Sequence, residues 1–343
     1  MQVQSFDDMP HNAGAWDAYV SRHEAATSDH LWGWRRVLSR AFGYRPYYLG
    51  AMDGDRLAGI LPLFHIPRSM GRSALASIPF GNAGGVCADD ALARQTLVDA
   101  AQVLADQLRA VHVDLRHRLP LADRRLQHQP LYRRFTMRLN QGDADTHLRR
   151  MRRDIRYDIT RGLRLGLTMT TSRRTDQLYP IHVETFRRLG TPCFPRRYFE
   201  LILQEFPQAR VHLVAFHRQW IAFTILFTFK EQMMCLVNGS VTRSLRYRPN
   251  TALMWAAVQY GYAHGMTLLD YGRSRVDSGA AAFKRELGFT EEPLGYQYYL
   301  PDRAPMPQRN PSNPKYHLVI RVWRRLPLRL TRAVGPVIVR YLA

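Results

Sequence analysis

Residues 45–66 read RPYYLGAMDGDRLAGILPLFHI, and this stretch indicates how the first half of the chain folds. Two apolar runs flank Asp53 and Gly54, a dipeptide that favours the tight turn of a β-hairpin. Apolar side chains then recur at helical spacing across residues 97–108, and a short strand pattern follows at residues 111–117. The sequence therefore predicts an α/β unit that starts with a hairpin and closes with a strand after a helix.

The second half of the chain repeats this order. Residues 211–230 read as strand, turn and strand, and residues 233–237 form another apolar strand pattern. A helical pattern follows at residues 253–261, and MTLLDYG at residues 266–272 closes the unit. One kind of α/β unit is thus expected twice in the same chain.

Composition places the chain among globular proteins. Its 343 residues can form two domains, and 46% hydrophobic with 22% charged residues is ordinary for that class. The first residues carry acids and no apolar run, and no stretch reaches the roughly 18 apolar residues of a membrane span. We expect a cytoplasmic protein. Its cysteines, Cys87, Cys193 and Cys235, lie far apart and read as reduced structural thiols.

The formal net charge of +21 suggests a polyanionic partner or an anionic membrane. However, only Lys230, Lys284 and Lys315 are lysines among the 49 basic residues. Such an excess of arginine suggests a GC-rich genome that supplies arginine wherever a surface cation serves. Part of the positive charge therefore reflects codon usage at solvated positions. An anionic partner and a merely solvated basic surface both stay open.

A basic helix is predicted between the halves, at residues 146–167. Its apolar residues recur at helical spacing, while Arg149, Arg153 and Arg156 fall on another face. This face is either a solvated surface or an anion-binding one, because guanidinium groups suit phosphate and carboxylate.

Several segments, in this order along the chain, resemble the FemAB family and are most similar to its subgroup associated with exosortase/PEP-CTERM and exopolysaccharide systems. They are WGWRRVLSRAFGYRPYYLGA (32–51), SIPFGNAGGVCAD (77–89), VDLR (113–116), RRDIRYDITRGL (152–163), RLGTPCFPRRYF (188–199), LLDYGRSRVDSG (268–279) and AFKRELGF (282–289).

The resemblance implies an α/β fold of two tandem GNAT-like (acyl-CoA N-acyltransferase-like) domains with mixed central sheets. We expect a first domain at residues 1–145, a second with the donor and acceptor site at 146–300, and a tail at 301–343. The best-known members transfer amino acids from aminoacyl-tRNA to peptidoglycan precursor peptides. Two departures, Ala280–Ala282 before Phe283 and the strand at 235–241, weaken the inference about substrate.

Residue patterns by themselves favour direct transfer. The sequence has no Gly-x-Ser-x-Gly elbow, no tight metal-ligand spacing and no glycine-rich nucleotide loop. Transfer of an acyl group to an amine without a covalent enzyme intermediate needs positioning and a stabilised oxyanion. We expect no metal and no tightly bound cofactor.

Lys284 is the first catalytic candidate, because a compact ammonium can approach an oxyanion as a point charge. With Phe283 it matches the Phe-Lys pair of the Fem proteins. Asp270, at the end of the last apolar strand, is a candidate general base or holds Arg273, and a structural salt bridge between these two is the alternative. Arg273 and Ser274 are candidate binding residues.

Further binding candidates lie in GSVTRSLRYRPN, residues 239–250, and on the basic helix. They are Arg246, Arg248 and Asn250, together with Arg153 and Arg156. A loop that cradles CoA phosphates would offer backbone N–H groups, but this one has no glycine after its first residue and contains a proline. The loop favours an aminoacyl-tRNA donor over acyl-CoA, and a basic surface loop remains the alternative.

The tail contains a proline-rich linker at residues 301–314 and then helical apolar stripes with arginines and no acid at residues 315–343. This pattern predicts one of two arrangements. The tail either makes a peripheral contact with the inner face of an anionic membrane or packs on the first domain.

Three functions are compatible with these observations. The first is acyl or aminoacyl transfer to an amine of a cell-envelope or exopolysaccharide precursor, with tRNA as a candidate partner. The second is CoA-dependent N-acetylation of a small amine, and the third is a catalytically silent envelope-assembly or binding protein.

Overall fold

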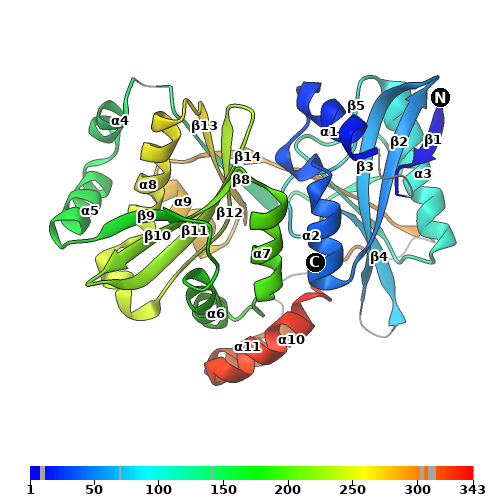
Figure 1. Cartoon of the computed structure of the whole chain (residues 1–343). Coiled ribbons are helices and arrows are strands. Elements are labelled where there is room, and N and C mark those ends of the chain that lie inside the picture. Colours follow the sequence, from blue (N-terminus) through cyan, green and yellow to red (C-terminus); the bar gives the residue numbers. More distant parts are fainter. Residues whose placement is uncertain (8–11, 69–70, 141, 302–304, 308–313, 343) are drawn as a thin grey trace. The chain divides into compact units, whose positions relative to one another are not determined.

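The chain forms two compact units in the computed structural model, which describes residues 1–7, 12–68, 71–140, 142–301, 305–307 and 314–342 (Figure 1). The first unit comprises Met1–Tyr132, Pro293–Gln308 and Arg340–Ala343, and the second comprises Arg133–Glu292 and Arg309–Val339. These boundaries differ from the expected ones at 145 and 300, because the strand after residue 131 joins the second sheet and a late strand returns to the first.

The first unit is a mixed sheet with helices. Its helices are α1 (Asn12–Arg22), η1 (Ser28–His30), α2 (Gly33–Phe42) and α3 (Ala91–Gln107). Its strands are β1 (Gln2–Ser5), β2 (Arg45–Asp53), β3 (Arg56–Pro67), β4 (Ser73–Ser77), β5 (Cys87–Ala88), β6 (Val113–His117), β7 (Gln127–His128) and β15 (Gly295–Tyr299). The order across the sheet is β1-β2-β3-β4-β6-β15-β7, with β5 paired to β3.

The second unit holds the other sheet, in the order β14-β8-β13-β12-β11-β10-β9. Its strands are β8 (Tyr132–Arg138), β9 (Thr168–Ser172), β10 (Ala209–Phe216), β11 (Gln219–Phe229), β12 (Gln232–Ser240), β13 (Leu268–Arg275) and β14 (Thr290–Pro293). Its helices are α4 (Ala144–Arg150), α5 (Arg153–Arg164), α6 (Leu178–Leu189), α7 (Arg196–Glu205), η3 (Thr242–Tyr247), α8 (Pro249–Ala263), α9 (Gly279–Glu286), α10 (Pro314–Arg325) and α11 (Leu328–Val339).

Both units contain the repeated order that the sequence predicts. A hairpin, a third strand, a helix and a closing strand occur as β2-β3-β4-α3-β6 and as β10-β11-β12-α8-β13. In each copy the third and closing strands are parallel, whereas the hairpins are antiparallel. The helix carries the chain back between two parallel neighbours, as such a crossover requires. The predicted mixed central sheets are confirmed.

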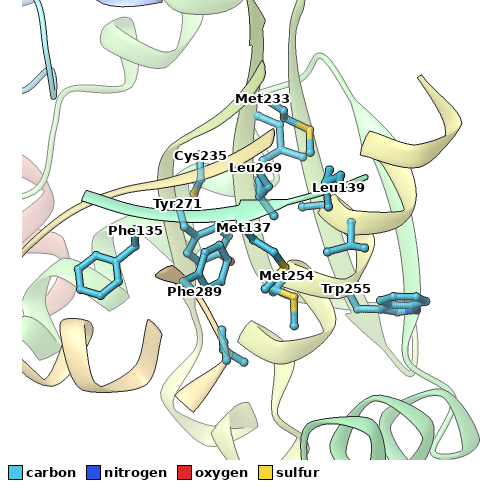
Figure 2. Packing of buried hydrophobic residues seen from close by; sticks show 14 of the residues in the cluster. Phe135, Met137, Leu139, Met233, Cys235, Met254, Trp255, Leu269, Tyr271 and Phe289 are labelled. Carbon is cyan, nitrogen blue, oxygen red and sulfur yellow. The ribbon is translucent and has the colours of Figure 1, made fainter. Parts of the chain in front are cut away.

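One core cluster of the second unit lies between its sheet and α8. Figure 2 shows this cluster, in which Met233, Leu269 and Phe289 pack with Met254 and Trp255 of α8. Helix α8 is not amphipathic, because residues on most of its sides are buried. The packed cluster fixes the strand ends that follow it.

The basic stretch at 146–167 differs from the single predicted helix. Met151 and Arg152 adopt extended backbone angles, so α4 ends before them and α5 begins after them. Arg156 donates a hydrogen bond to the carbonyl of Arg149 and so bridges the break. Both helices contact α8.

The tail helices pack on the second unit, so the alternative in which they pack on the first is wrong. Helices α10 and α11 lie against α6. Trp323 donates its indole N–H to the carbonyl of Thr191 at 3.2 Å, and Arg187 donates to the carbonyl of Leu326 at 3.0 Å. Only the last residues belong to the first unit, where the hydroxyl of Tyr44 donates to the carbonyl of Arg340 at 2.7 Å. The linker predicted at 301–314 lies largely outside the described residues.

A tight contact in the first unit gives a test of its packing. A Cβ at Gly295 would lie 2.2 Å from the backbone nitrogen of Pro120 and 2.3 Å from the carbonyl carbon of Leu119, and backbone atoms cannot move aside cheaply. We expect Gly295→Ala to lower the free energy of unfolding by about 3 kcal/mol, as measured by thermal and chemical denaturation. Gly14→Ala, in α1 with no atom within 4 Å of the new Cβ, is the matched control and should be neutral or stabilising. Equal stability of the two variants would contradict the packing.

Candidate functional site

The parallel pairing of β12 and β13 stops partway along both strands, and the unpaired stretch beyond it is called the gap here. Their paired register covers Gln232–Met234 and Leu268–Asp270, and beyond it both strands continue, to Ser240 and to Arg275. On its other side β12 has a bulge, because its pairing with β11 shifts between Val237 and Cys235. A bulge bends a strand and often marks a functional edge. The gap lies at the carboxyl ends of the two strands, where α/β folds commonly bind ligands.

Lys284 projects from α9 to the end of β13. The helix begins at Ser278, whose side chain accepts a hydrogen bond from the N–H of Ala281. The lysine is 7% exposed, and its Nζ donates to the carbonyls of Gly272 at 3.2 Å and Arg273 at 3.3 Å. Its Nζ also lies 5.1 Å from the ring centre of Phe135, a cation–π contact. An ammonium group is thus held where β13 leaves the paired register.

Burial lowers the pKa of Lys284 to about 8, although nearby Cys235 and Asp270 favour its charged form. Desolvation disfavours the ammonium more than these neighbours stabilise it. A lysine with a pKa this close to neutrality, next to an open strand end, is typical of functional sites.

Asp270 pairs with Arg134, a partner that sequence analysis missed. Arg134 Nε on β8 donates to Asp270 Oδ2 at 2.7 Å, and Arg134 Nη1 lies 3.3 Å from a carboxylate oxygen of Glu292. The other oxygen of Asp270 accepts the N–H of Gly272 at 2.8 Å. The ion pair expected with Arg273 is therefore made with Arg134 instead, because the aspartate points towards the neighbouring strand.

Gly272 connects this ion pair to the lysine. Its φ of 71° lies in the left-handed region that suits glycine. Its N–H is held by Asp270, and its carbonyl accepts from Lys284. The chain Arg134–Asp270–Gly272–Lys284 therefore fixes the ammonium relative to the sheet.

Two further side chains on β12 line the same region and were not selected from the sequence. Cys235 is buried, its Sγ lies 3.0 Å from the hydroxyl of Thr224, and the amide of Asn238 lies 3.7 Å from the same sulfur. Burial raises the pKa of Cys235, so the thiol stays protonated. In Figure 2 Cys235 lies beside Tyr271 at one end of the core cluster, away from Trp255. No sequence pattern predicts the bulge that separates Cys235 from Val237 on this strand.

The remaining candidates on β13 and α9 occupy different environments. Ser274 is buried, Arg273 is half-buried and lies between Gly272 and Ser274 on β13, and Phe283 is half-buried against the core cluster. Phe283 therefore anchors α9 beside Lys284. The structure brings Lys284, Asp270, Arg273 and Phe283 to one strand end.

The N-terminus of α8 follows the same end of β12. Pro249 is its first residue and has no N–H, while the N–H groups of Thr251 and Ala252 both donate to the carbonyl of Arg248. Within residues 249–252 this leaves Asn250 to offer a backbone N–H to a phosphate. Such a helix end is a poor backbone cradle for a pyrophosphate.

Arginine side chains surround this helix end. The backbone of Arg248 is in the left-handed region, with a φ of 54°. Its Nε lies 3.4 Å from Oδ2 of Asp158 on α5. Arg246 is exposed and donates to the hydroxyl of Tyr247. The Arg248–Asp158 ion pair joins the loop to the basic helix, on which Arg153 is exposed and Arg156 half-buried. The loop thus contacts α5 through Asp158, whereas Arg153 and Arg156 lie on another side of that helix.

The corresponding gap in the first unit is filled. There the parallel register ends at Ala76 and Asp114, the positions that match Met234 and Asp270. The loop after β4 returns to β6, because the N–H of Gly85 donates to the carbonyl of Arg116 at 2.8 Å. The guanidinium of Arg116 pairs with Asp114 at 2.9 Å and also donates to a carbonyl of that loop. The first unit thus has an equivalent aspartate but no open gap.

A known family model matches a range that lies within the second unit. Residues 149–285 match the family model of an acetyltransferase (GNAT) domain. This range contains the gap, the basic loop and Lys284. No curated protein matches the chain.

Solved structures with the same fold cover both units. FemX matches with a TM-score of 0.66 at 14% identity, over 88% of this chain and 97% of its own. A tandem GNAT protein of clavulanic acid biosynthesis has a TM-score of 0.57 at 12% identity, covering 87% of this chain and 97% of its own. The C-terminal domain assigned to a lysylphosphatidylglycerol synthetase of Agrobacterium fabrum has a TM-score of 0.56 at 15% identity, covering 84% and 91%. The tandem GNAT-like fold is confirmed.

The depressed pKa of Lys284 gives a stability test that needs no substrate. Between pH 8 and 10.5 the unfolded lysine keeps its proton and the folded one loses it, so stability rises with pH in this window. We expect the free energy of unfolding of the wild type to rise relative to that of Lys284→Met by on the order of 3 kcal/mol across it. Denaturant titrations at pH 7, 8.5 and 10 measure the difference.

The same substitution at the exposed Lys230 is the control and should show no such trend. A pH-independent difference at Lys284 would mean that its ammonium is not desolvated.

Proposed function

We propose that the protein transfers an acyl or aminoacyl group to an amine at the gap between β12 and β13. The observation that carries the proposal is Lys284, a buried ammonium held at the open end of β13 within the range that matches a GNAT acetyltransferase domain. Burying a lysine is unfavourable, and a binding module gains nothing from placing one at an open strand end.

The proposed reaction is direct. The neutral amine of the acceptor attacks the donor carbonyl, a C–N bond forms, and the carbonyl oxygen becomes an oxyanion beside Lys284. The intermediate collapses by breaking the bond between the carbonyl carbon and the donor oxygen or sulfur. The proton lost by the amine ends on that leaving group. Lys284 lowers the barrier because its charge is in place before the oxyanion forms.

Asp270 acts in this proposal through position rather than as a base. Both oxygens of its carboxylate already accept hydrogen bonds, one from Arg134 and one from the N–H of Gly272, so Asp270 fixes the end of β13. Arg273 and Ser274 are assigned to substrate binding, since they follow on β13 along the gap.

The donor is proposed to be aminoacyl-tRNA, gripped by side chains rather than by backbone amides. Arg246 and Arg248 of the loop supply guanidinium groups for phosphates, and Arg153 and Arg156 of α5 are assigned to more distant phosphates of the same donor. The FemAB resemblance and the similarity to FemX support this choice, and a tRNA donor implies action in the cytoplasm. The acceptor is an amine of a cell-envelope or exopolysaccharide precursor, in line with the exosortase-associated subgroup.

N-acetylation from acetyl-CoA is the second candidate, because the matching family model is that of an acetyltransferase domain. The two donors are separated by incubating the protein with a charged tRNA pool or with an acyl-CoA panel, and following donor depletion by mass spectrometry. If neither donor is consumed, the result would favour a catalytically silent envelope-assembly protein.

Lys284 should affect turnover more than binding. We expect Lys284→Met to lower kcat by about 100- to 1000-fold with little change in KM, since the lost interaction forms mainly in the transition state. Lys284→Arg should recover only a small part, because its planar group is wider, and Phe283→Leu should lose less than either. Full activity of a folded Lys284→Met variant would remove the lysine from the mechanism.

The basic loop should affect binding more than turnover. Arg246→Ala with Arg248→Ala should raise KM for the donor by about tenfold and leave kcat nearly unchanged. Arg174→Ala, which breaks an exposed pair with Asp176 away from this loop, is the control. An unchanged KM in the double variant would exclude the loop from donor binding.

A further inference from the structure

Helices α10 and α11 carry apolar side chains on the face turned away from α6. This outer face consists of Leu318 (67% exposed), Val319 (62%), Val322 (51%), Leu328 (40%), Leu330 (44%), Val334 (37%) and Val337 (60%). Leu330, Val334 and Val337 follow one another at helical spacing, so they form a stripe and not scattered contacts. The apolar stripe predicted from the sequence is therefore exposed.

The face packed on α6 is a different one. Trp323, Thr331, Gly335 and Val339 are buried, and the last three recur every four residues along α11. A Cβ at Gly335 would lie 2.7 Å from the sulfur of Cys193, so the contact is close. Docking on α6 thus holds both helices in place without covering the outer face.

The outer face is accompanied by arginine and by no acid. Arg321, Arg325 and Arg329 are exposed between the apolar positions, and residues 303–343 contain neither Asp nor Glu. Arginines alone would suit a polynucleotide, but a polynucleotide backbone offers nothing to cover leucine and valine side chains. A partner with an anionic surface and an apolar interior satisfies both.

We propose that the outer face of α10 and α11 docks on an anionic lipid bilayer. Each helix has 12 residues, about 18 Å of length, and lies in the interface instead of crossing it. Among the residues that the structure describes, no helix meets the length and hydropathy needed to span a bilayer. The arginines reach headgroup phosphates while the valines and leucines enter the acyl boundary.

This docking deepens the proposed function, on which it rests in one respect. An acceptor amine on a lipid-linked envelope precursor is confined to the membrane surface. A transferase held there by α10 and α11 meets that acceptor without first extracting it. The sequence leaves packing on the protein and contact with the membrane as alternatives. In this proposal the two contacts use different faces of the same helices.

The test is flotation of the full chain with vesicles of phosphatidylcholine alone or with about one-third phosphatidylglycerol. We expect binding to the anionic vesicles only, weakened when salt rises from 0.1 to 0.5 M. Val334→Asp with Val337→Asp should reduce the partition coefficient by at least about tenfold. Leu92→Asp with Val103→Asp, on comparably exposed positions of α3 at 61% and 55%, is the matched control and should bind like the wild type. Point variants are preferred to deletion of 315–343, which would uncover α6.

Three results would overturn the proposal. The first is that the wild type does not bind anionic vesicles. The second is that the Val334/Val337 variant binds them as well as the wild type does. The third is that the wild type is a dimer that does not bind vesicles, and that this variant is a monomer. The last would identify a second copy as the occupant. The variant should keep wild-type kcat on a water-soluble acceptor, so loss of docking and loss of transfer are measured separately.

Discussion

The buried ion pair between Arg134 and Asp270 is the contact on which the arrangement of the site depends. It joins β8 to β13 through side chains that are both about nine-tenths buried. Removing one partner would leave the other charged and desolvated, which typically destabilises a protein by about 3–5 kcal/mol. The pair also holds Gly272, whose carbonyl receives the ammonium of Lys284. Stability of the second sheet and geometry of the site therefore share one interaction.

Much of the fold could be predicted from the sequence, because the repeated hairpin, helix and closing strand have local signals. Lys284 could also be selected, since lysine is rare in this chain. Arg134 could not, because it is one of two adjacent arginines on β8 and its partner is 136 residues away. The break at Met151 and the docking of α11 on α6 were equally hidden, since they depend on tertiary contacts and not on periodicity.

The two units use one architecture differently. Both end the parallel register at an aspartate that pairs with arginine. In the first unit the following loop is hydrogen-bonded back onto β6, with Ile78 and Phe80 at positive φ. Non-glycine residues in that region are strained, and such strain persists where surrounding contacts over-determine the backbone. In the second unit the loop turns outward into η3 and α8, and the strand end stays available to Lys284.

The filled gap of the first unit offers a criterion for other duplicated chains of this architecture. Under the proposed function, the half that holds the site is the one in which the segment after the third strand continues into the helix instead of folding back onto the closing strand. A chain with both segments folded back would keep the scaffold without such a site, and a chain with neither folded back would have two. Here a short glycine-rich segment is held by Asp29, which accepts the N–H groups of Asn82 and Ala83, so the difference between the halves is built into the backbone of the first unit.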